Sequence, residues 1–466
     1  MRLLPRSDCY RRRMQTPKLI APVAAAMLIA LLAAWPAAAQ TPNVTTQTLP
    51  TLGGPTGSAF SINSHGDIVG MSQTDSGTMR ATLWSNGTVT DLGALCPACL
   101  VSIGFSINDH NQVVGYAFDA NFSPRPVFYA NGAAIALLSP AGYDQGVAMM
   151  INNSGQIAGY VAGADGVAGV LWASPTAAPQ VTSLYAATAL NDAGDMAGLL
   201  LNSCGTYQAA VSRNGVVEAL ESGGPCLDSM AWFINAAGLV AGTSLDGNGL
   251  SRATIWNGGA RILNEPLPGF ARSSAAALNA SGDLVGLSGD PSYFAYPTLA
   301  TVWLPEGTLA LTPHPTGSGR DVSTGVAINA AAQVVGTSYD GNGFSRPTVW
   351  TIDVDRQPPA ITINAPDAIF PPNGKMVPVT FAGSITDASG IASASFAVVD
   401  EYGTVQPSGR VMLDAGGNFA TTVMLEARRN GPDRDGRTYT FTVTATDVKG
   451  LTGTGTATAA VTTGRK

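Results

Sequence analysis

The stretch INSHGDIVG at residues 62–70 occurs seven times in this chain with small changes. The later copies are INDHNQVVG from residue 107, INNSGQIAG from 151, LNDAGDMAG from 190, INAAGLVAG from 234, LNASGDLVG from 278 and INAAAQVVG from 328. The Asn residues of successive copies are 45, 44, 39, 44, 44 and 50 positions apart. A period of about 40 to 50 residues is typical both of propeller blades and of helical arrays, so composition has to distinguish the two.

The composition favours strands. The chain has 54 Gly and 30 Pro, only 12% of its residues are charged, and short apolar stretches lie between Gly, Asn, Asp and Ser. In the last copy, residues 326–329, 333–339 and 346–350 are three predicted strands. In earlier copies an Asn-Gly turn, such as Asn86-Gly87, leads to a fourth strand at positions such as 89–92. Four strands per repeat indicate the blades of a β-propeller.

The two ends of the repeat array complement each other. After the last aromatic strand the chain runs into TIDVD at 351–355 and QPP at 357–359, which has the composition of a linker, so the last repeat lacks a fourth strand. The segment TTQTLPTLGG at 45–54 is similar to the fourth-strand segment VTDLG at 89–93. We therefore predict a closed seven-bladed propeller over residues 44–356, in which the N-terminal strand completes the last blade and removes two exposed sheet edges.

The repeats resemble a known family. The I-N-x-x-G-x-V-V-G phrase, the apolar-Trp strand that follows it (for example Thr82-Leu-Trp84) and the Asp91-Leu-Gly93 ending resemble the bacterial HAF extracellular repeats over about two thirds of the chain. The resemblance implies the repeat fold and an extracellular location, and it implies no catalytic residue. Where that family often has His-Ala-Phe, this chain has Arg-Ala-Thr, Arg-Pro-Val or Arg-Pro-Thr, so no role of the family histidine carries over.

The first 39 residues have the pattern of a signal peptide. Three arginines at 11–13 and Lys18 precede an apolar run over 19–35, and the alanines at 37–39 suit signal peptidase, which predicts cleavage before Gln40. The residue directly after the cleavage site is not a cysteine, and no later segment has the roughly 18 uninterrupted apolar residues of a membrane helix. We expect a secreted or periplasmic bacterial protein.

Four cysteines remain after cleavage, as suits an oxidising compartment. If Asn214-Gly215 is a two-residue hairpin turn, Cys204 faces a position one residue from Cys226, which favours a disulfide between them. Cys96 and Cys99 then pair with each other across a loop. The competing interpretation is that this Cys-x-x-Cys is a redox or metal half-site. It is disfavoured because the sequence has no second Cys or His pair to complete a metal site and no thioredoxin-like pattern around it.

Residues 357–466 differ from the repeats. Stretches with period-two alternation, such as 360–364, 377–381 and 439–445, are separated by turns, which predicts an immunoglobulin-like β-sandwich. PPNGKMV at 371–377 and TATD at 444–447 also resemble segments of bacterial immunoglobulin-like modules. Such a module can be a spacer, an adhesive tip or a sugar-binding platform.

Four arginines are the candidate binding residues. They stand four positions before an aromatic residue of a predicted third strand: Arg80 before Trp84, Arg125 before Tyr129, Arg252 before Trp256 and Arg346 before Trp350. Because residues i and i+4 of a strand face the same side, the guanidinium group can pack on the ring. The alternative is that the arginines surround one face of the propeller and bind a carboxylate-bearing polymer, such as an acidic polysaccharide, through bidentate contacts.

No catalytic constellation is visible. The chain has three histidines, of which His65 and His110 occupy the same turn position in adjacent repeats; they are interpreted as exposed turn residues rather than as a shared metal site. The repeat Asn residues are interpreted as turn residues, because an Asn side chain can bond to its own backbone two positions on. No metal or other cofactor is expected.

These observations predict an all-β, exported, non-catalytic binding or adhesion scaffold whose partner is an extracellular polysaccharide or a surface protein. The alternative is a polysaccharide lyase or glycosidase on a propeller fold, whose carboxylates could converge from different blades. The net charge of −7 and the lack of a Lys/Arg cluster after signal removal argue against nucleic acid. The protein is expected to be a monomer.

Overall fold

The computed structural model describes residues 42–463 apart from 131, 290–297, 314–321, 365–367, 432, 434 and 435. The predicted signal peptide lies outside these residues. The described part of the chain forms strands and no helix, so it contains no helix that could cross a membrane.

Between Asn43 and Asp353 the described strands form seven four-stranded antiparallel sheets. Their strands are β2 (Gly53–Ile62), β3 (Ile68–Thr74), β4 (Met79–Ser85) and β5 (Thr88–Asp91); β6 (Ser102–Ile107), β7 (Val113–Phe118), β8 (Pro124–Ala130) and β9 (Ala133–Ala136); β10 (Tyr143–Ile151), β11 (Ile157–Gly163), β12 (Gly166–Trp172) and β13 (Gln180–Val181); β14 (Ala186–Leu190), β15 (Met196–Leu201), β16 (Tyr207–Arg213) and β17 (Val216–Ala219); β18 (Ser229–Ile234), β19 (Val240–Leu245), β20 (Ser251–Asn257) and β21 (Ala260–Asn264); β22 (Ser273–Leu278), β23 (Leu284–Ser288), β24 (Leu299–Leu304) and β25 (Gly307–Leu311); and β26 (Ser323–Ile328), β27 (Gln333–Tyr339), β28 (Ser345–Asp353) and β1 (Asn43–Thr48). Small antiparallel sheets grouped around a common centre are the architecture of the β-propeller class.

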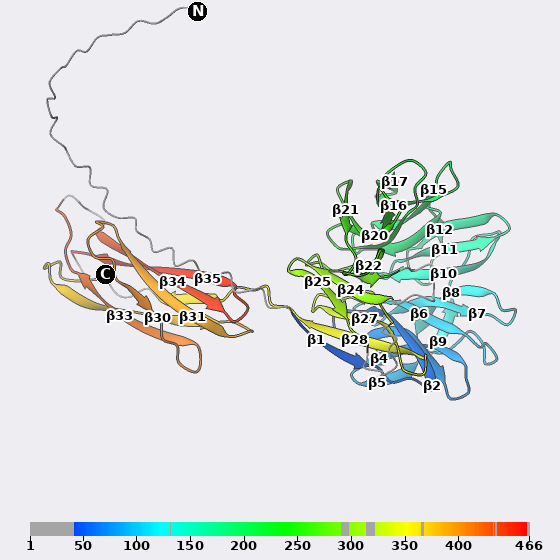
Figure 1. Cartoon of the computed structure of the whole chain (residues 1–466), viewed down its shortest axis with the longest axis horizontal. Helices are drawn as coiled ribbons and strands as arrows, with labels where there is room; N and C mark the ends of the chain where they lie inside the picture. Colours follow the sequence, from blue (N-terminus) through cyan, green and yellow to red (C-terminus); the bar gives the residue numbers. More distant parts are fainter. Residues whose placement is uncertain are drawn as a thin grey trace, which may run out of the picture. The chain divides into compact units, whose positions relative to one another are not determined.

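The last sheet is completed from the other end of the chain. Strand β1 pairs antiparallel with β28, from Asn43 opposite Asp353 to Thr48 opposite Thr348, and in Figure 1 the blue β1 lies beside the yellow β28. This is the pairing that the sequence predicts. It gives β28 a hydrogen-bonded neighbour on both of its edges, so the ring has no open edge at that strand.

The Asn-Gly turns predicted before the outer strands are present in the structure. Between β4 and β5, φ is 49° at Asn86 and 75° at Gly87. Between β16 and β17, φ is 51° at Asn214 and 79° at Gly215. Two consecutive residues with positive φ form the type I′ turn that Asn-Gly favours.

Every first strand contains a β-bulge, and the last glycine of each repeat makes room for it. In β18 the register with β19 shifts between Ala231 and Phe233, so Trp232 is the extra residue. A Cβ atom on Gly242 would lie 1.9 Å from the carbonyl oxygen of Met230, so no larger residue fits there. The same close approach occurs at Gly70, Gly115, Gly159, Gly198, Gly286 and Gly336.

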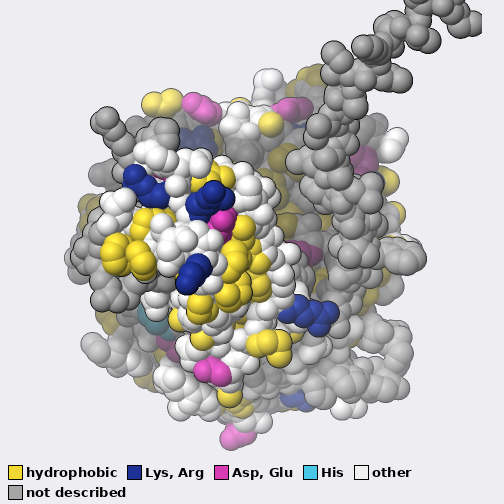
Figure 2. Space-filling model, turned by 90° about the vertical axis from the view of Figure 1, so that its left-hand side faces the viewer, with side chains coloured by type: hydrophobic (Ala, Val, Ile, Leu, Met, Phe, Trp, Pro, Cys, Tyr) yellow, Lys and Arg dark blue, Asp and Glu magenta, His cyan; other side chains and the backbone are white. Residues whose placement is uncertain are grey.

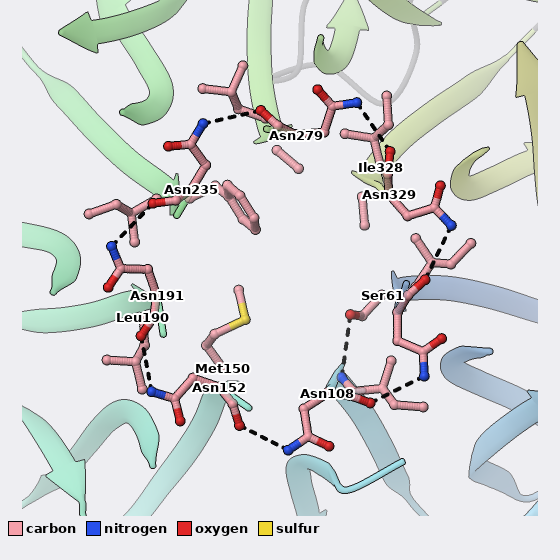
Figure 3. Close-up of a pocket in the computed structure, with 18 of the residues that line it drawn as sticks. Ser61, Asn108, Met150, Asn152, Leu190, Asn191, Asn235, Asn279, Ile328 and Asn329 are labelled. Carbon is pink, nitrogen blue, oxygen red and sulfur yellow. Dashed lines mark hydrogen bonds between the residues drawn. The ribbon is translucent and has the colours of Figure 1, made fainter. Parts of the chain in front are cut away.

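The repeat Asn residues link successive sheets into a closed ring (Figure 3). In each repeat the Asn Nδ2 donates to the backbone carbonyl of the next repeat Asn, at 2.9 to 3.2 Å. The participants in order are Asn63, Asn108, Asn152, Asn191, Asn235, Asn279 and Asn329, and Asn329 donates back to Asn63. The Asn Oδ1 accepts from backbone amides of its own turn, as at Ala237 and Leu239 for Asn235. The turn role predicted for these residues is present, and a contact between sheets is added to it.

Buried tryptophans make a second set of contacts between sheets. The indole Nε1 of a third-strand Trp donates to a backbone carbonyl 34 to 38 residues earlier, beyond the outer strand of the preceding sheet. The pairs are Trp84 with Pro50, Trp172 with Leu138, Trp256 with Glu221, Trp303 with Glu265 and Trp350 with Thr312. The indole therefore fills the space between two sheets and satisfies its only donor there.

The C-terminal part is a β-sandwich. One sheet contains β29 (Ala360–Asn364), β30 (Met376–Thr386) and β33 (Asn418–Glu426), and the other contains β32 (Ser408–Arg410), β31 (Ile391–Asp400), β34 (Arg437–Asp447) and β35 (Thr452–Val461). The buried core between them includes Phe381 from the first sheet and Phe441 from the second, whose rings stack with centroids 4.2 Å apart. Alternate residues of β34 are buried, which is the period-two pattern of a half-buried strand.

Candidate functional site

The bulged residues of the seven first strands line one cavity of about 720 Å³ at the centre of the ring. These are the residues three positions before each repeat Asn: Phe60, Phe105, Met149, Thr188, Trp232, Ala276 and Val326. Four of them are large and three are small, whereas the repeat Asn and the Gly seven positions after it are the same in all seven repeats. The scaffold thus repeats while the side chains at the centre vary, which is the arrangement expected of a ligand site on a repeat fold.

A second cavity of about 660 Å³ adjoins the first, because Phe105, Met149, Thr188 and Trp232 line both. Its other aromatic residues come from three successive sheets: Tyr116 and Phe118 from β7, Tyr160 from β11, Tyr207 from β16, and Tyr185 just before β14. No charged side chain occurs among the described residues that line it. Apolar pockets with a few polar groups are the usual form of small-molecule sites.

The aromatic side chains are packed against one another. The ring centroids of Phe60 and Phe105 are 5.4 Å apart, and those of Phe105 and Tyr116 are 5.6 Å apart. Burial raises the pKa of Tyr116 and, likewise, the pKa of Tyr160. Both hydroxyl groups are therefore protonated at neutral pH, and each can donate a hydrogen bond to a ligand.

The side of the first cavity that carries the repeat Asn residues has two carboxylates, and both have partners within the protein. Asn153 Nδ2 donates to Asp109 Oδ2 at 3.1 Å and to Asp192 Oδ2 at 3.0 Å. Burial alone would raise the pKa of Asp109, but hydrogen bonds from Ser64 and Asn153 and the nearby His65 outweigh it and hold the pKa below its ordinary value. Asp109 is thus an anion at neutral pH and has no proton to donate as a general acid.

Three of the four predicted arginines lie at contacts between sheets, and the fourth, Arg346, pairs within its own hairpin. Arg80, Arg125 and Arg252 each donate from a guanidinium nitrogen to a backbone carbonyl 19 residues further on, at Cys99, Asp144 and Ala271. Arg252 also pairs with Asp246 at 2.8 Å, and Arg346 makes two hydrogen bonds of 2.8 and 2.9 Å to Asp340 Oδ2. None of the four lines either cavity. All four guanidinium groups already have partners within the protein. Their role in ligand binding stays a prediction.

Both disulfides have the pairing that the sequence favours, Cys96 with Cys99 and Cys204 with Cys226. Cys204 lies between β15 and β16, and Cys226 follows β17, so the bond joins two loops beside the hairpin rather than two paired strand residues. The side chains of His65 and His110 are exposed, and His314 lies outside the described residues.

Reasoning from the sequence did not find the cavity residues. The repeat was recognised by its constant positions, and the side chains of the cavity occupy the variable position before it. The available signal was that the position three before the invariant Asn varies in size from Ala to Trp.

Figure 2 shows hydrophobic side chains next to Lys and Arg side chains on one face. Several large apolar residues of the sandwich are exposed, among them Met376, Val399 and Met412.

No protein-family model matches this chain, and no curated protein matches it. Among solved structures, TolB from Acinetobacter baumannii is 12% identical with a TM-score of 0.34, and the similarity covers 52% of this chain and 63% of that one. A puromycin-hydrolyzing peptidase of Mycobacterium tuberculosis is 12% identical with a TM-score of 0.42, covering 76% and 60%. A Ca²⁺-stabilized adhesin with which an Antarctic bacterium binds ice is 14% identical with a TM-score of 0.17, covering 91% and 99%. The chain spans less than two thirds of the TolB and peptidase chains, and similarities at this level assign no function to it.

Proposed function

We propose that the ring of sheets is a seven-bladed β-propeller closed by its N-terminal strand. The sheet order supports this, since six sheets contain four consecutive strands and the seventh takes β1 as its outer strand. The ring of Asn contacts, which returns from Asn329 to Asn63, supports closure independently of β1. We further propose that these repeats belong with the HAF-type extracellular repeats that they resemble.

The C-terminal sandwich is proposed to be an immunoglobulin-like module. The Tyr439 hydroxyl, near the start of β34, donates to the carbonyl of Glu426 at 3.0 Å and accepts from its amide at 3.2 Å. A tyrosine whose hydroxyl bonds to the backbone upstream of its strand is typical of immunoglobulin-like sandwiches.

The protein as a whole is proposed to be an exported, non-catalytic binding scaffold that takes a neutral extracellular glycan in the ring. The uncharged aromatic cavity carries this proposal. The C–H face of a sugar ring is apolar and packs on aromatic faces, while its hydroxyl groups need hydrogen-bond partners such as those of Tyr116 and Tyr160. An acidic glycan would bring charge to a cavity whose described lining offers no Lys or Arg.

Export is supported by the cysteines. All four that follow the predicted signal peptide are in disulfides, and structural disulfides persist in oxidising compartments outside the cytoplasm.

The test is binding of the chain from residue 40 onward to arrays of neutral and acidic glycans, with product analysis of the bound glycan. Trp232→Ala and Tyr160→Ala are expected to weaken binding of a neutral glycan by about tenfold or more, as for an anchoring aromatic residue. Phe344→Ala is the matched control, because Phe344 is 39% exposed and lines neither cavity.

Three results would overturn parts of the proposal. Released oligosaccharide would mean that the protein is an enzyme. Binding of acidic glycans that is lost in Arg252→Gln and kept in Trp232→Ala would move the site to the arginines. Binding of no glycan at all would leave a surface protein as the partner.

A further inference from the structure

Three aspartates from separate segments meet beside the sandwich. Asp355 lies between β28 and β29, Asp387 directly follows β30, and Asp447 is the last residue of β34. One carboxylate oxygen from each lies within 4.8 Å of the others. Three formal negative charges this close repel one another unless a cation lies between them.

Each of these carboxylates uses one oxygen in its own turn. Oδ1 of Asp355 accepts from the amide of Gln357 at 3.0 Å, and Oδ1 of Asp387 accepts from the amide of Ser389 at 2.8 Å. Oδ1 of Asp447 accepts from the amides of Lys449 and Leu451, at 2.8 and 2.9 Å. The second oxygen of each carboxylate is left over for another partner.

Two of the leftover oxygens have no hydrogen-bond partner among the residues that the structure describes. Oδ2 of Asp355 and Oδ2 of Asp447 are buried without a hydrogen bond, and Asp447 is only 1% exposed. None of the ion pairs between described residues involves the three aspartates, and the nearby ammonium of Lys449 binds Asp353 at 2.9 Å instead. A buried carboxylate oxygen with neither a donor nor a cation is costly, so this arrangement needs an additional group.

The backbone holds the three segments in place. The amide of Val448 donates to the carbonyl of Gly390 at 3.1 Å, which joins the turns of Asp387 and Asp447. A Cβ atom on Gly453 would lie 2.1 Å from the carbonyl oxygen of Pro359, so this glycine lets the linker approach β35 closely. The cluster therefore results from backbone packing and not from mobile surface side chains.

We propose that Asp355, Asp387 and Asp447 bind a divalent cation, specifically Ca²⁺. Calcium takes oxygen ligands at about 2.4 Å, so two of its ligands are at most about 4.8 Å apart, and the separation of the three carboxylate oxygens fits that shell. Mg²⁺ has a smaller coordination shell and gives up its bound water reluctantly, so we expect it to bind this site more weakly than Ca²⁺. The ion ties the linker residue Asp355 to two turns of the sandwich, a role separate from glycan binding in the ring.

The test is calorimetric titration of the chelator-treated chain with CaCl₂, together with thermal unfolding with and without Ca²⁺. We expect one bound ion, a transition that shifts upward with Ca²⁺, and a smaller shift with equal Mg²⁺. Asp447→Asn and Asp387→Asn should each lower the Ca²⁺ affinity about tenfold or more, because each removes a ligand charge.

Asp414→Asn is the matched control. Asp414 accepts from backbone amides in its own turn, as Asp447 does, but it is not in the cluster, so its variant should keep the Ca²⁺ response. If Asp447→Asn does not fold, the Ca²⁺ titration of the unchanged chain still tests the site. Absence of binding heat and of a Ca²⁺-dependent shift in that chain would overturn the proposal, as would equal losses in Asp414→Asn and Asp387→Asn.

Discussion

The side chain of Asn329 donates to the backbone carbonyl of Asn63 at 3.2 Å, joining residues that are 266 positions apart. The same donor and acceptor meet between all other neighbouring repeats, so one contact type both links the sheets and closes the ring. Closure thus has two independent components, this contact and the pairing of β1 with β28.

Removal of β1 should destabilise the whole ring. A chain that starts at residue 49 leaves an edge of β28 unpaired, and we expect a lower thermal midpoint and aggregation through that edge. A chain that starts at residue 42 is the control. Scanning calorimetry measures the thermal midpoints of the two chains. Identical unfolding transitions would contradict closure of the ring by β1.

The two roles of a repeat Asn can be separated at Asn235. Asn235→Asp keeps an oxygen for the amides of Ala237 and Leu239 but loses the donor to Asn279, while Asn235→Ala loses both. We expect Asn235→Ala to cost about 1 to 3 kcal/mol of unfolding free energy and Asn235→Asp to cost more at neutral pH, because its buried carboxylate would face the carbonyl oxygen of Asn279. Denaturant titration measures both. A cost of Asn235→Asp well below that of Asn235→Ala would contradict the contact with Asn279.

Arg252 should contribute to stability. It is buried, pairs with Asp246 at 2.8 Å and donates to the carbonyl of Ala271 at 2.7 Å. The hydrogen bond from Leu250 and the charge of Arg252 help to hold the pKa of Asp246 below its ordinary value. Arg252→Gln should therefore lower the unfolding free energy by about 1 to 3 kcal/mol. If the variant instead loses binding of acidic glycans with unchanged stability, the predicted ligand role is correct.

Arg437 should control the acid stability of the sandwich. It is 1% exposed, donates from Nε to Asp400 Oδ1 at 2.8 Å, and lies over the rings of Tyr402 and Tyr439. Burial alone would raise the pKa of Asp400, but hydrogen bonds from Arg437 and from backbone amides outweigh it and hold the pKa well below its usual range. This stabilisation is present above the unfolded pKa of about 3.9 and is lost as pH falls through the folded pKa.

Replacement of Arg437 should reverse that dependence. Arg437→Met leaves Asp400 as a buried unpaired anion, which costs about 3 to 5 kcal/mol at pH 7, and protonation of Asp400 should then stabilise the sandwich. Thermal midpoints between pH 7 and pH 3 measure the effect. Arg428→Met, at a side chain that is 70% exposed, should keep the behaviour of the unchanged chain. A midpoint of Arg437→Met that falls with acid as steeply as in the unchanged chain would contradict the assignment.

Local sequence determined the architecture and the covalent links. The repeat period and the Asn-Gly turns predict four-stranded units, since strand patterns and turn residues act within a few positions of the chain. The similarity of residues 45–54 to 89–93 predicted the pairing of β1 with the last sheet, and the spacing around Asn214-Gly215 predicted the disulfide between Cys204 and Cys226.

Only the tertiary structure decided which side chains face the cavity and which charges meet. Trp232 lines the cavity because a bulge turns it inward, and that bulge depends on pairing with another strand. Asp355, Asp387 and Asp447 are 32 and 60 positions apart in sequence, and no periodic pattern relates them. Such contacts arise from the packing of complete sheets, so the sequence by itself predicted a scaffold and left its cavity and its acidic cluster to the fold.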